Sequence, residues 1–437
     1  MIQTHFEVSS KAPALNQHLA ETRIVAQEIV HFLEAIYHTA SFLQTIPTRL
    51  LNHVSNKLEQ EPLLTQLLES FLETIHHTGS FLKTLYLFTA SDFPTFAIPT
   101  ILFGIFGTLS GPVLTTSTAP SFTSTITRIP SALLLIWTNL LIFNISNQRT
   151  PSAAAEDAVN KPSRPIPSGR ITIERARQIN LLLVPIVLAL SWAAGVWHTT
   201  LLLLAMQWMY NDLRGCDESL VLRNVLIAVG YGLYSAIALA VLSGPEAVIA
   251  RRGYAWIGVV GFVMLTTQHI CDIKDAAGDR LRGRRSAPIV LGDAGCRWSV
   301  AVPILACSLA CPAFFGLGAL SYVFTLSFGL VVAGRTLFLR SLAADRVTWK
   351  LWAAWTCSLF VLPLVASRGV AMDAGMLWEV VAHYACPGHD CAEKLNVLAV
   401  SGIAMAVKGS NVLGRMDVGR AESNMTAVPS ISVEVVA

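Results

Sequence analysis

The sequence predicts an all-α membrane protein, a polytopic bundle of about nine transmembrane helices around a central cavity. Hydrophobic residues make up 53% of the 437 positions and charged residues only 14%, whereas a soluble domain usually carries roughly a quarter charged residues. The apolar residues also gather in repeated blocks of about 18–22 positions, the length with which an α-helix crosses roughly 30 Å of hydrocarbon. These blocks predict the lipid bilayer as a partner. Because the net charge is only +3, we expect no nucleic acid.

Residues 1–90 are more polar than the central part of the chain and contain an internal repeat. The segment FLEAIYHTASFLQT begins at Phe32, and the similar segment FLETIHHTGSFLKT begins at Phe71. In both copies the apolar residues recur at helical spacing. We therefore predict that residues 1–90 form an N-terminal region of two amphipathic helices that lie on the membrane face or pack together.

The next region, 91–371, is expected to hold the transmembrane helices and the candidate functional residues. Interior prolines do not argue against these spans, because neighbouring helices can satisfy the backbone groups that a proline leaves free. The predicted spans are about 93–114, 129–146, 180–197, 199–210, 221–243, 254–271, 299–320, 321–340 and 350–371.

Basic residues are concentrated in the two long loops that follow the second and the sixth predicted span. Because loops rich in Lys and Arg stay on the cytosolic side of a membrane, we expect the N-terminus and both loops to face the cytosol. An odd number of spans then places residues 372–437 on the opposite side. This segment is weakly patterned and is rich in Ser, Val and Gly toward its end, which predicts a partly disordered tail.

The second of these loops contains three aspartates, Asp272, Asp275 and Asp279, at positions i, i+3 and i+7. If the preceding span continues as a helix, the three carboxylates share one face and repel one another. A bound Mg²⁺ suits such a face, since it prefers carboxylate oxygens and bridges to phosphates. Lys274 and Arg284 would then bind the phosphate. The alternative is a solvated loop in which acids and bases only pair with each other.

The first loop offers a weaker pattern of the same kind. Glu156 and Asp157 are candidates for a second metal site, and Lys161 and Arg164 follow at a distance that suits a phosphate. The alternative is that two adjacent acids in a proline-rich loop are simply solvated.

Two such loops at one end of a helix bundle indicate a site for a diphosphate that carries a hydrocarbon tail. Metal ions and cationic side chains would hold the diphosphate at the mouth, while the tail extends into an apolar chamber. Breaking the carbon–oxygen bond would leave an allylic cation, which aromatic faces stabilise. Trp137, Trp192 and Phe262 are examples of such aromatics, with ordinary packing as the alternative role of each ring.

These segments resemble the UbiA-type membrane prenyltransferase superfamily, in particular the fungal branch that includes membrane-bound terpene cyclases. The resemblance extends over about residues 85–370. It implies nine helices, two Mg²⁺-binding Asp-rich motifs and prenyl diphosphate substrates. The segments that carry it are NKPSRPIPSGR (160–170), DIKDAAGDRLRGRRSAP (272–288) and YNDLRGCDESLVLRN (210–224), a Tyr-containing loop with a basic residue, Arg223, near its end.

The second motif matches the family at all three aspartates, whereas the first departs from it. Asp157 matches the last acid of the first motif, but the earlier positions in strict register are Arg149, Thr150 and Ala153. A two-residue slip gives Asn147 the role of the motif's Asn, and Glu156 adds an acid. The resemblance thus implies four catalytic aspartates, Asp157, Asp272, Asp275 and Asp279. The implied metal ligands are these four together with Asn147 and Glu156. The implied diphosphate-binding residues are Lys161, Arg164, Arg223, Lys274 and Arg284.

The sequence therefore predicts an enzyme that acts on prenyl diphosphates. One hypothesis is a Mg²⁺-dependent terpene cyclase of secondary metabolism that converts farnesyl or geranylgeranyl diphosphate to a cyclic terpene. The second is transfer of the prenyl group to an aromatic or other acceptor, and the same residues serve both. A non-catalytic transporter is less favoured, because the acids lie at the ends of the spans and not at mid-membrane. The fungal resemblance implies the endoplasmic reticulum as the location.

Overall fold

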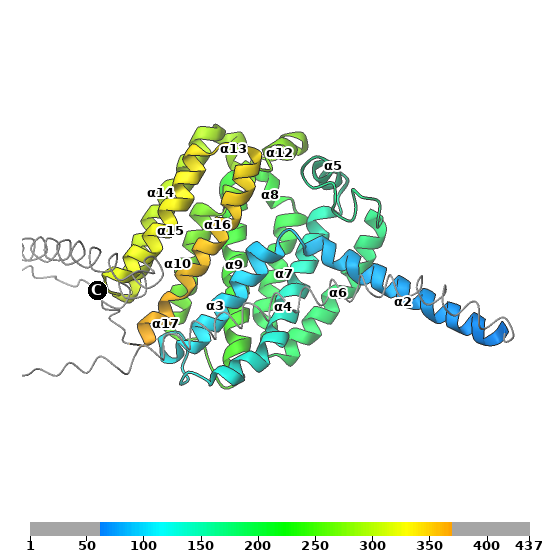
Figure 1. The fold of residues 1–437 in the computed structure, drawn as a ribbon, viewed down its shortest axis with the longest axis horizontal. Helices are drawn as coiled ribbons and strands as arrows, with labels where there is room; N and C mark the ends of the chain where they lie inside the picture. The colour runs from blue at the N-terminus through cyan, green and yellow to red at the C-terminus, as the bar shows by residue number, and fades with distance from the viewer. Residues whose placement is uncertain (1–61, 369–437) are drawn as a thin grey trace, which may run out of the picture. The chain divides into compact units, whose positions relative to one another are not determined.

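The computed structural model describes residues 62–368. Within this range the chain is helical, and its strand-like pairing is limited to one isolated bridge between Thr115 and Ile249. This confirms the predicted all-α class (Figure 1). The first repeat copy and the expected tail, 372–437, lie outside the described residues, while the second copy lies within the helix α2, Pro62–Thr89.

The predicted spans correspond to the longer helices, although their number is not confirmed. Seven helices are long and apolar enough to cross a bilayer, or eight if a bent pair counts as one span, in the part of the chain that the structure describes. In that pair, Ser70–Thr89 and Phe93–Leu109 meet at 58°. The expected fourth span is the helix α7, Trp197–Asn211, whose 15 residues fall short of the roughly 20 that a bilayer needs.

The bounds of the helices follow their capping residues and prolines. Ser121, Thr172, Ser219 and Ser341 each accept a hydrogen bond from the backbone N–H three residues on, and a long helix begins after each of them. The long helices are α3 (Ile98–Leu109, after the π-helical turn η1, Phe93–Ala97), α4 (Phe122–Gln148), α6 (Ile173–Ala193), α9 (Leu220–Ser243), α10 (Arg251–Thr267), α14 (Gly292–Phe315), α15 (Ala319–Phe338) and α16 (Leu342–Phe360), followed by the short α17 (Leu362–Ser367).

Helix α9 packs against α3, α4, α7 and α10. Its approach to α3 depends on a small residue, because a Cβ added at Gly104 would lie 2.9 Å from the backbone of Ala238. On the outer surface, by contrast, large apolar side chains are exposed, such as Leu181 and Leu182 of α6. An exposed apolar surface of this kind suits contact with lipid tails.

Short helices gather at one end of the bundle. They are α5 (Pro151–Asn160), α8 (Gly215–Glu218), α12 (Ala276–Arg282) and α13 (Ala287–Val290), and Figure 1 shows all four at the top of the view. The two acid-and-base loops of the sequence contain α5 and α12, so the fold brings both to the same end.

The spacing of the three aspartates predicts one shared face if the helix continues through the second loop, but the helix is interrupted there. Helix α10 ends at Thr267, the short helix α11 covers Ile270–Ile273, and α12 begins at Ala276. The three aspartates therefore lie on three successive pieces of chain and do not form one row on a single helix.

Candidate active site

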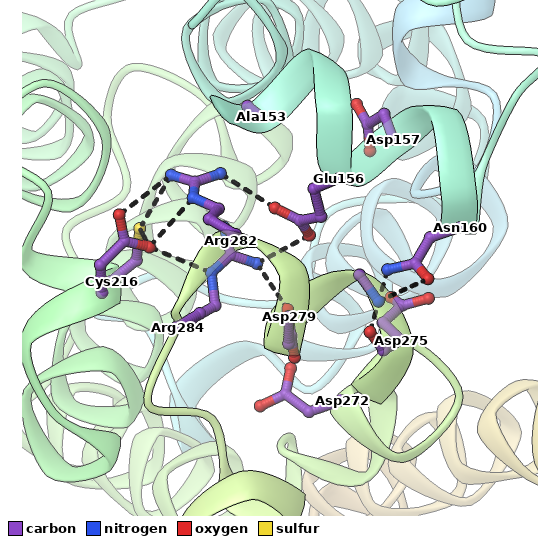
Figure 2. Close-up of polar contacts among 12 residues, drawn as sticks. Ala153, Glu156, Asp157, Asn160, Cys216, Asp272, Asp275, Asp279, Arg282 and Arg284 are labelled. Atoms are coloured by element: carbon purple, nitrogen blue, oxygen red, sulfur yellow. Dashed lines mark hydrogen bonds and ion pairs between the residues drawn. The ribbon is translucent and has the colours of Figure 1, made fainter. Parts of the chain in front are cut away.

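The two loops are joined directly by Asn160, at the end of α5. Its Nδ2 donates to the carbonyl of Asp275 at 2.9 Å, and its Oδ1 accepts from the backbone N–H of Gly278 at 3.1 Å (Figure 2). A Cβ at Gly278 would lie only 2.3 Å from Asn160 Nδ2. Glycine at this position therefore allows α5 and α12 to approach closely.

Asp272 is held by a buried arginine of α9. Arg223 donates from Nη2 to Asp272 Oδ1 at 2.6 Å and from Nε to Oδ2 at 3.2 Å, and its Nη1 donates to the hydroxyl of Tyr210. Both partners of the ion pair are almost completely buried. Two parallel hydrogen bonds between guanidinium and carboxylate fix their relative orientation as well as their distance.

Asp275 faces a different set of partners. Its Oδ2 accepts from Lys274 Nζ at 2.7 Å and from Lys161 Nζ at 3.2 Å. Burial disfavours the charge on this carboxylate, but the two ammonium groups outweigh burial and lower the pKa of Asp275 well below its usual range. Asp275 thus stays ionised and links the first loop to the second.

Asp279 lies beside Asp272, and the two side chains point toward each other in Figure 2. Asp279 Oδ1 accepts from Arg284 Nη1 at 3.1 Å, while Oδ2 is buried without a hydrogen bond of normal geometry. Burial and the charge of Asp272 raise the pKa of Asp279 to about 6. This carboxyl group therefore titrates near neutral pH and has one oxygen available to a ligand.

The two acids of the first loop have separate surroundings. Both oxygens of Glu156 are occupied, since Oε2 accepts from Arg282 at 3.0 Å and Oε1 from Arg284 at 3.1 Å. Asp157 Oδ1 accepts from Arg164 at 2.8 Å, whereas its Oδ2 is buried without a partner. Burial outweighs Arg164 and raises the pKa of Asp157. Of this pair, Asp157 has the oxygen that a cation could use.

Sequence reasoning did not single out Asp217 or Arg282, which complete the charged cluster. Asp217, on α8, accepts from Arg282 Nη2 at 3.3 Å and from Arg284 Nε at 3.2 Å. Three arginines, with Arg214 as the third, outweigh burial and lower the pKa of Asp217. Both residues lie inside the segments that carry the family resemblance. They are 65 positions apart, and nothing in the sequence indicates that the fold brings them into contact.

Among the other predicted residues, Asn147 lies in the last turn of α4 and is partly buried. Arg149, one of the positions where the first motif departs from the family, forms an ion pair with Asp212. Lys274 is stacked 4.2 Å from the ring centre of Trp349, in addition to its bond with Asp275. Lys161, Arg164, Arg223, Lys274 and Arg284 all have carboxylate partners in this structure.

An apolar chamber of about 150 Å³ adjoins the charged cluster. Tyr210 lies at the junction, because it lines the chamber and accepts a hydrogen bond from Arg223. The ring of Phe96 packs edge-on against two other lining tyrosines, with ring centres 5.1 and 4.7 Å apart. The aromatic lining consists of Phe96, Phe143, Tyr210, Tyr231, Tyr234, Trp349 and Trp352.

The three aromatic residues offered as examples from the sequence do not line this chamber. Trp137 donates a hydrogen bond to Thr89 at 3.0 Å. Trp192 and Phe262 are 73% and 59% exposed on the surface of the bundle, where we expect lipid. Helix orientation places them outward, and a single apolar span does not show which of its faces is turned inward.

The residues fit Mg²⁺ as a companion of a phosphate, although not as a closed protein cage. Within residues 62–368, no group of three or more His, Cys, Asp or Glu side chains is arranged to hold a metal ion. Mg²⁺ bound with a phosphorylated substrate needs only one or two carboxylates, however, because water and phosphate oxygens complete its shell. The buried, unpartnered oxygens of Asp157 and Asp279 are the candidates for such ligands.

Comparison with known proteins identifies the family of the chain. The sequence model of the UbiA prenyltransferase family matches residues 105–362, which is more than half of the chain. The chain belongs to the UbiA prenyltransferase family. This membership confirms the predicted enzyme class and, together with the long apolar helices, an integral membrane protein with several spans.

The UbiA relatives of the chain include enzymes with names of both hypothesised kinds. Fumagillin beta-trans-bergamotene synthase of Aspergillus fumigatus is 30% identical over 220 residues, which cover 50% of this chain and 69% of that protein. Polyprenyl transferase eriF of Hericium erinaceus is 26% identical over 239 residues, which cover 53% and 78% of the two chains. A solved structure of a UbiA homologue from Archaeoglobus fulgidus, bound to DMAPP and Mg²⁺, is 15% identical, has a TM-score of 0.46, and covers 64% of this chain and 99% of its own.

Proposed function

We propose that the protein is a Mg²⁺-dependent terpene cyclase that ionises farnesyl or geranylgeranyl diphosphate and closes the hydrocarbon chain into a ring. The observation that carries this proposal is the junction at Tyr210. One contact, from Arg223 to the Tyr210 hydroxyl, connects a cluster suited to a diphosphate with a chamber suited to a hydrocarbon. A substrate with a charged head and an apolar tail fits across that junction.

The basic residues of the cluster would bind the diphosphate. Lys161 and Lys274 come from different loops but share one carboxylate, Asp275, so their ammonium groups lie close together. An anionic ligand there would gain two charge-assisted contacts. When bound, Mg²⁺ neutralises part of the charge of the diphosphate and makes it a better leaving group. Asp157 and Asp279 are the residues that we expect to hold the metal.

The chamber would control the hydrocarbon part of the reaction. Aromatic faces attract a cation that lies over the ring, which stabilises the allylic cation left when the carbon–oxygen bond breaks. The turn η1 and the helices α4, α7, α9, α10, α11 and α16 contribute side chains to the walls, and apolar walls limit the access of water that would otherwise capture the cation. Attack by a double bond of the same chain then forms the ring.

The small size of the chamber gives limited room for an acceptor beside the prenyl chain, and this supports the proposal of cyclisation. A cavity of about 150 Å³ is comparable to one that encloses a single benzene molecule. A prenyl chain alone must widen it, and an aromatic acceptor beside that chain requires still more space. The second candidate, acceptor prenylation, keeps support from the relative named as a polyprenyl transferase.

For location, we propose the endoplasmic reticulum, with the two loops facing the cytosol. The support is the cluster of Arg and Lys at the end that contains α5 and α12, because basic loops are retained on the cytosolic side.

Expression of the full chain in a host rich in prenyl diphosphates tests the proposed function. We expect the extract to contain a cyclic terpene hydrocarbon that is absent from the same host carrying the Asp279→Asn variant, as measured by mass spectrometry. A prenylated aromatic compound in place of the hydrocarbon would support the transferase instead. Equal extracts from both strains would contradict the assignment of an enzyme on prenyl diphosphates.

A further inference from the structure

A carboxylate lies in the wall of the apolar chamber, outside the two acid-and-base loops. Asp92 lies in the bend between α2 and η1, and it is the one acid among the chamber-lining residues that the structure describes. It also precedes residue 105, where the match to the family begins. Motif-based reasoning therefore did not draw attention to it.

The backbone fixes Asp92 next to the aromatic wall. The N–H of Phe96 donates to the carbonyl of Asp92 at 2.8 Å, which starts the helical turn of η1. Both residues, with Thr95 between them, line the chamber. The carboxylate thus lies within one turn of a ring that we expect to face the allylic cation.

The carboxylate is oriented by its neighbours but not saturated by them. Ser91 Oγ donates to Asp92 Oδ1 at 3.2 Å. Arg164 Nη2 lies 3.9 Å from Asp92 Oδ2, which is too long for a hydrogen bond, because Arg164 makes its short contact with Asp157. Asp92 Oδ2 therefore keeps the capacity to accept a proton.

The other polar groups of the lining are poor proton acceptors. They are hydroxyl, amide and thiol groups, from Thr95, Gln207, Tyr210, Tyr231, Tyr234, Gln268 and Cys271. Hydroxyl, thiol and amide groups are weak general bases, whereas a carboxylate is an ordinary general base in enzymes. A cyclisation that ends in a hydrocarbon must release one proton, and a carboxylate in the wall can accept it close to the hydrocarbon.

We propose that Asp92 is the base that accepts the proton lost at the end of cyclisation; this inference rests on the cyclase function proposed above. A C–H bond next to the cationic carbon breaks, and its electron pair becomes the new carbon–carbon double bond. The proton moves to Asp92 Oδ2, which turns the carboxylate into a carboxylic acid and leaves a neutral terpene. Asp92 then passes the proton to the released diphosphate at the mouth of the chamber.

The test uses the purified full-length protein with prenyl diphosphate and Mg²⁺ and no acceptor, and measures released diphosphate and terpene products together. For Asp92→Asn we expect diphosphate release within about threefold of wild type, because ionisation precedes the proposed proton transfer. The wild-type hydrocarbon should fall by about tenfold or more, with alcohols or isomeric hydrocarbons in its place. Asp92→Glu should retain the wild-type hydrocarbon as the main product.

The matched control is Asp212→Asn, which removes a carboxylate that pairs with Arg149 and does not line the chamber. It should leave the product mixture unchanged. Three results would overturn the role of Asp92 but leave the cyclase function standing. The first is an unaltered product mixture from Asp92→Asn, and the second is an equal loss of diphosphate release and hydrocarbon in that variant. The third is the same altered mixture from Asp92→Glu. A wild-type enzyme that makes no hydrocarbon without an acceptor would overturn the cyclase function itself.

Discussion

Arg223 binds both carboxylate oxygens of Asp272 and, through its third nitrogen, the hydroxyl of Tyr210. The pair is buried, so if one charge is lost, water cannot solvate the charge that remains. Through Tyr210 it also forms part of the boundary between the charged cluster and the aromatic chamber. We therefore expect stability and function to depend on the same contact.

Replacing Arg223 by Gln should destabilise the protein. The variant leaves Asp272 as a buried charge without a cation, and breaking a buried ion pair in this way costs about 3–5 kcal/mol. We expect a lower midpoint of thermal unfolding in detergent, measured beside Arg177→Gln, which removes an exposed ion pair of α6 and should change little. Equal midpoints for both variants would show that the Arg223–Asp272 pair is not a buried structural contact.

Asp279→Ala or Asp272→Ala should abolish turnover, while the protein still inserts into the membrane. Asp272→Ala should also lower the midpoint of thermal unfolding, because it leaves Arg223 buried without its partner. Removing a carboxylate that supports the metal and diphosphate raises the barrier by several kcal/mol, so we expect a loss of about 100-fold or more. Glu156→Gln is the comparison, because both Glu156 oxygens bind arginines, and its loss should be smaller. Wild-type product levels from Asp279→Ala, measured with equal amounts of membrane protein, would refute this site.

Activation by Mg²⁺ should weaken as the pH falls below about 6. The pKa of Asp279 is raised to about 6, so this group is protonated in the metal-free protein at lower pH and must release its proton before it binds a cation. The Mg²⁺ concentration for half-maximal activity should therefore rise by up to about tenfold per pH unit below 6. Asp275 does not add to this effect, because its pKa is well below its usual range. The measurement is a Mg²⁺ titration of activity at several pH values between roughly 5 and 7. A Mg²⁺ concentration for half-maximal activity that stays constant over this range would contradict the prediction.

Gly278→Ala should reduce activity by separating the two loops. The new methyl group would overlap Asn160, whose side chain bonds to both Asp275 and Gly278. Gly258→Ala in α10 is a suitable control, since no atom lies within 4 Å of a Cβ there. Turnover per folded protein should fall for the first variant and stay unchanged for the second. Equal turnover would mean that the close approach at Gly278 does not matter for catalysis.

Much of the helical framework could be predicted from the sequence, because stretches of apolar residues long enough to cross a bilayer are visible there. The short fourth span, expected at about 199–210, is observed as α7. The bent pair of α2 and α3 is harder to predict, because a bend at residues 90–92 does not show in hydropathy. The helix breaks near His269 and Lys274 have the same cause. They contain no proline or glycine that would announce an interruption.

The residue types of the site were predicted better than their pairing. Asp272, Asp275 and Asp279 were expected to share one face, but Arg223, Lys161 and Arg284 divide them among separate ion pairs. Such pairs join residues 49 and 114 positions apart, and spacing along the chain carries no information on them. The chamber lining was missed for a related reason, because helix rotation determines which aromatic faces inward.

The most direct test of the central claim is the stoichiometry of the reaction without an acceptor. Purified wild-type protein in detergent or lipid vesicles is supplied with one prenyl diphosphate and Mg²⁺, and diphosphate and cyclic hydrocarbon are quantified in the same sample. A cyclase built from this cluster and chamber should form one cyclic hydrocarbon for each diphosphate released. Release of diphosphate with only linear alcohol, or no reaction until an aromatic acceptor is added, would contradict the account.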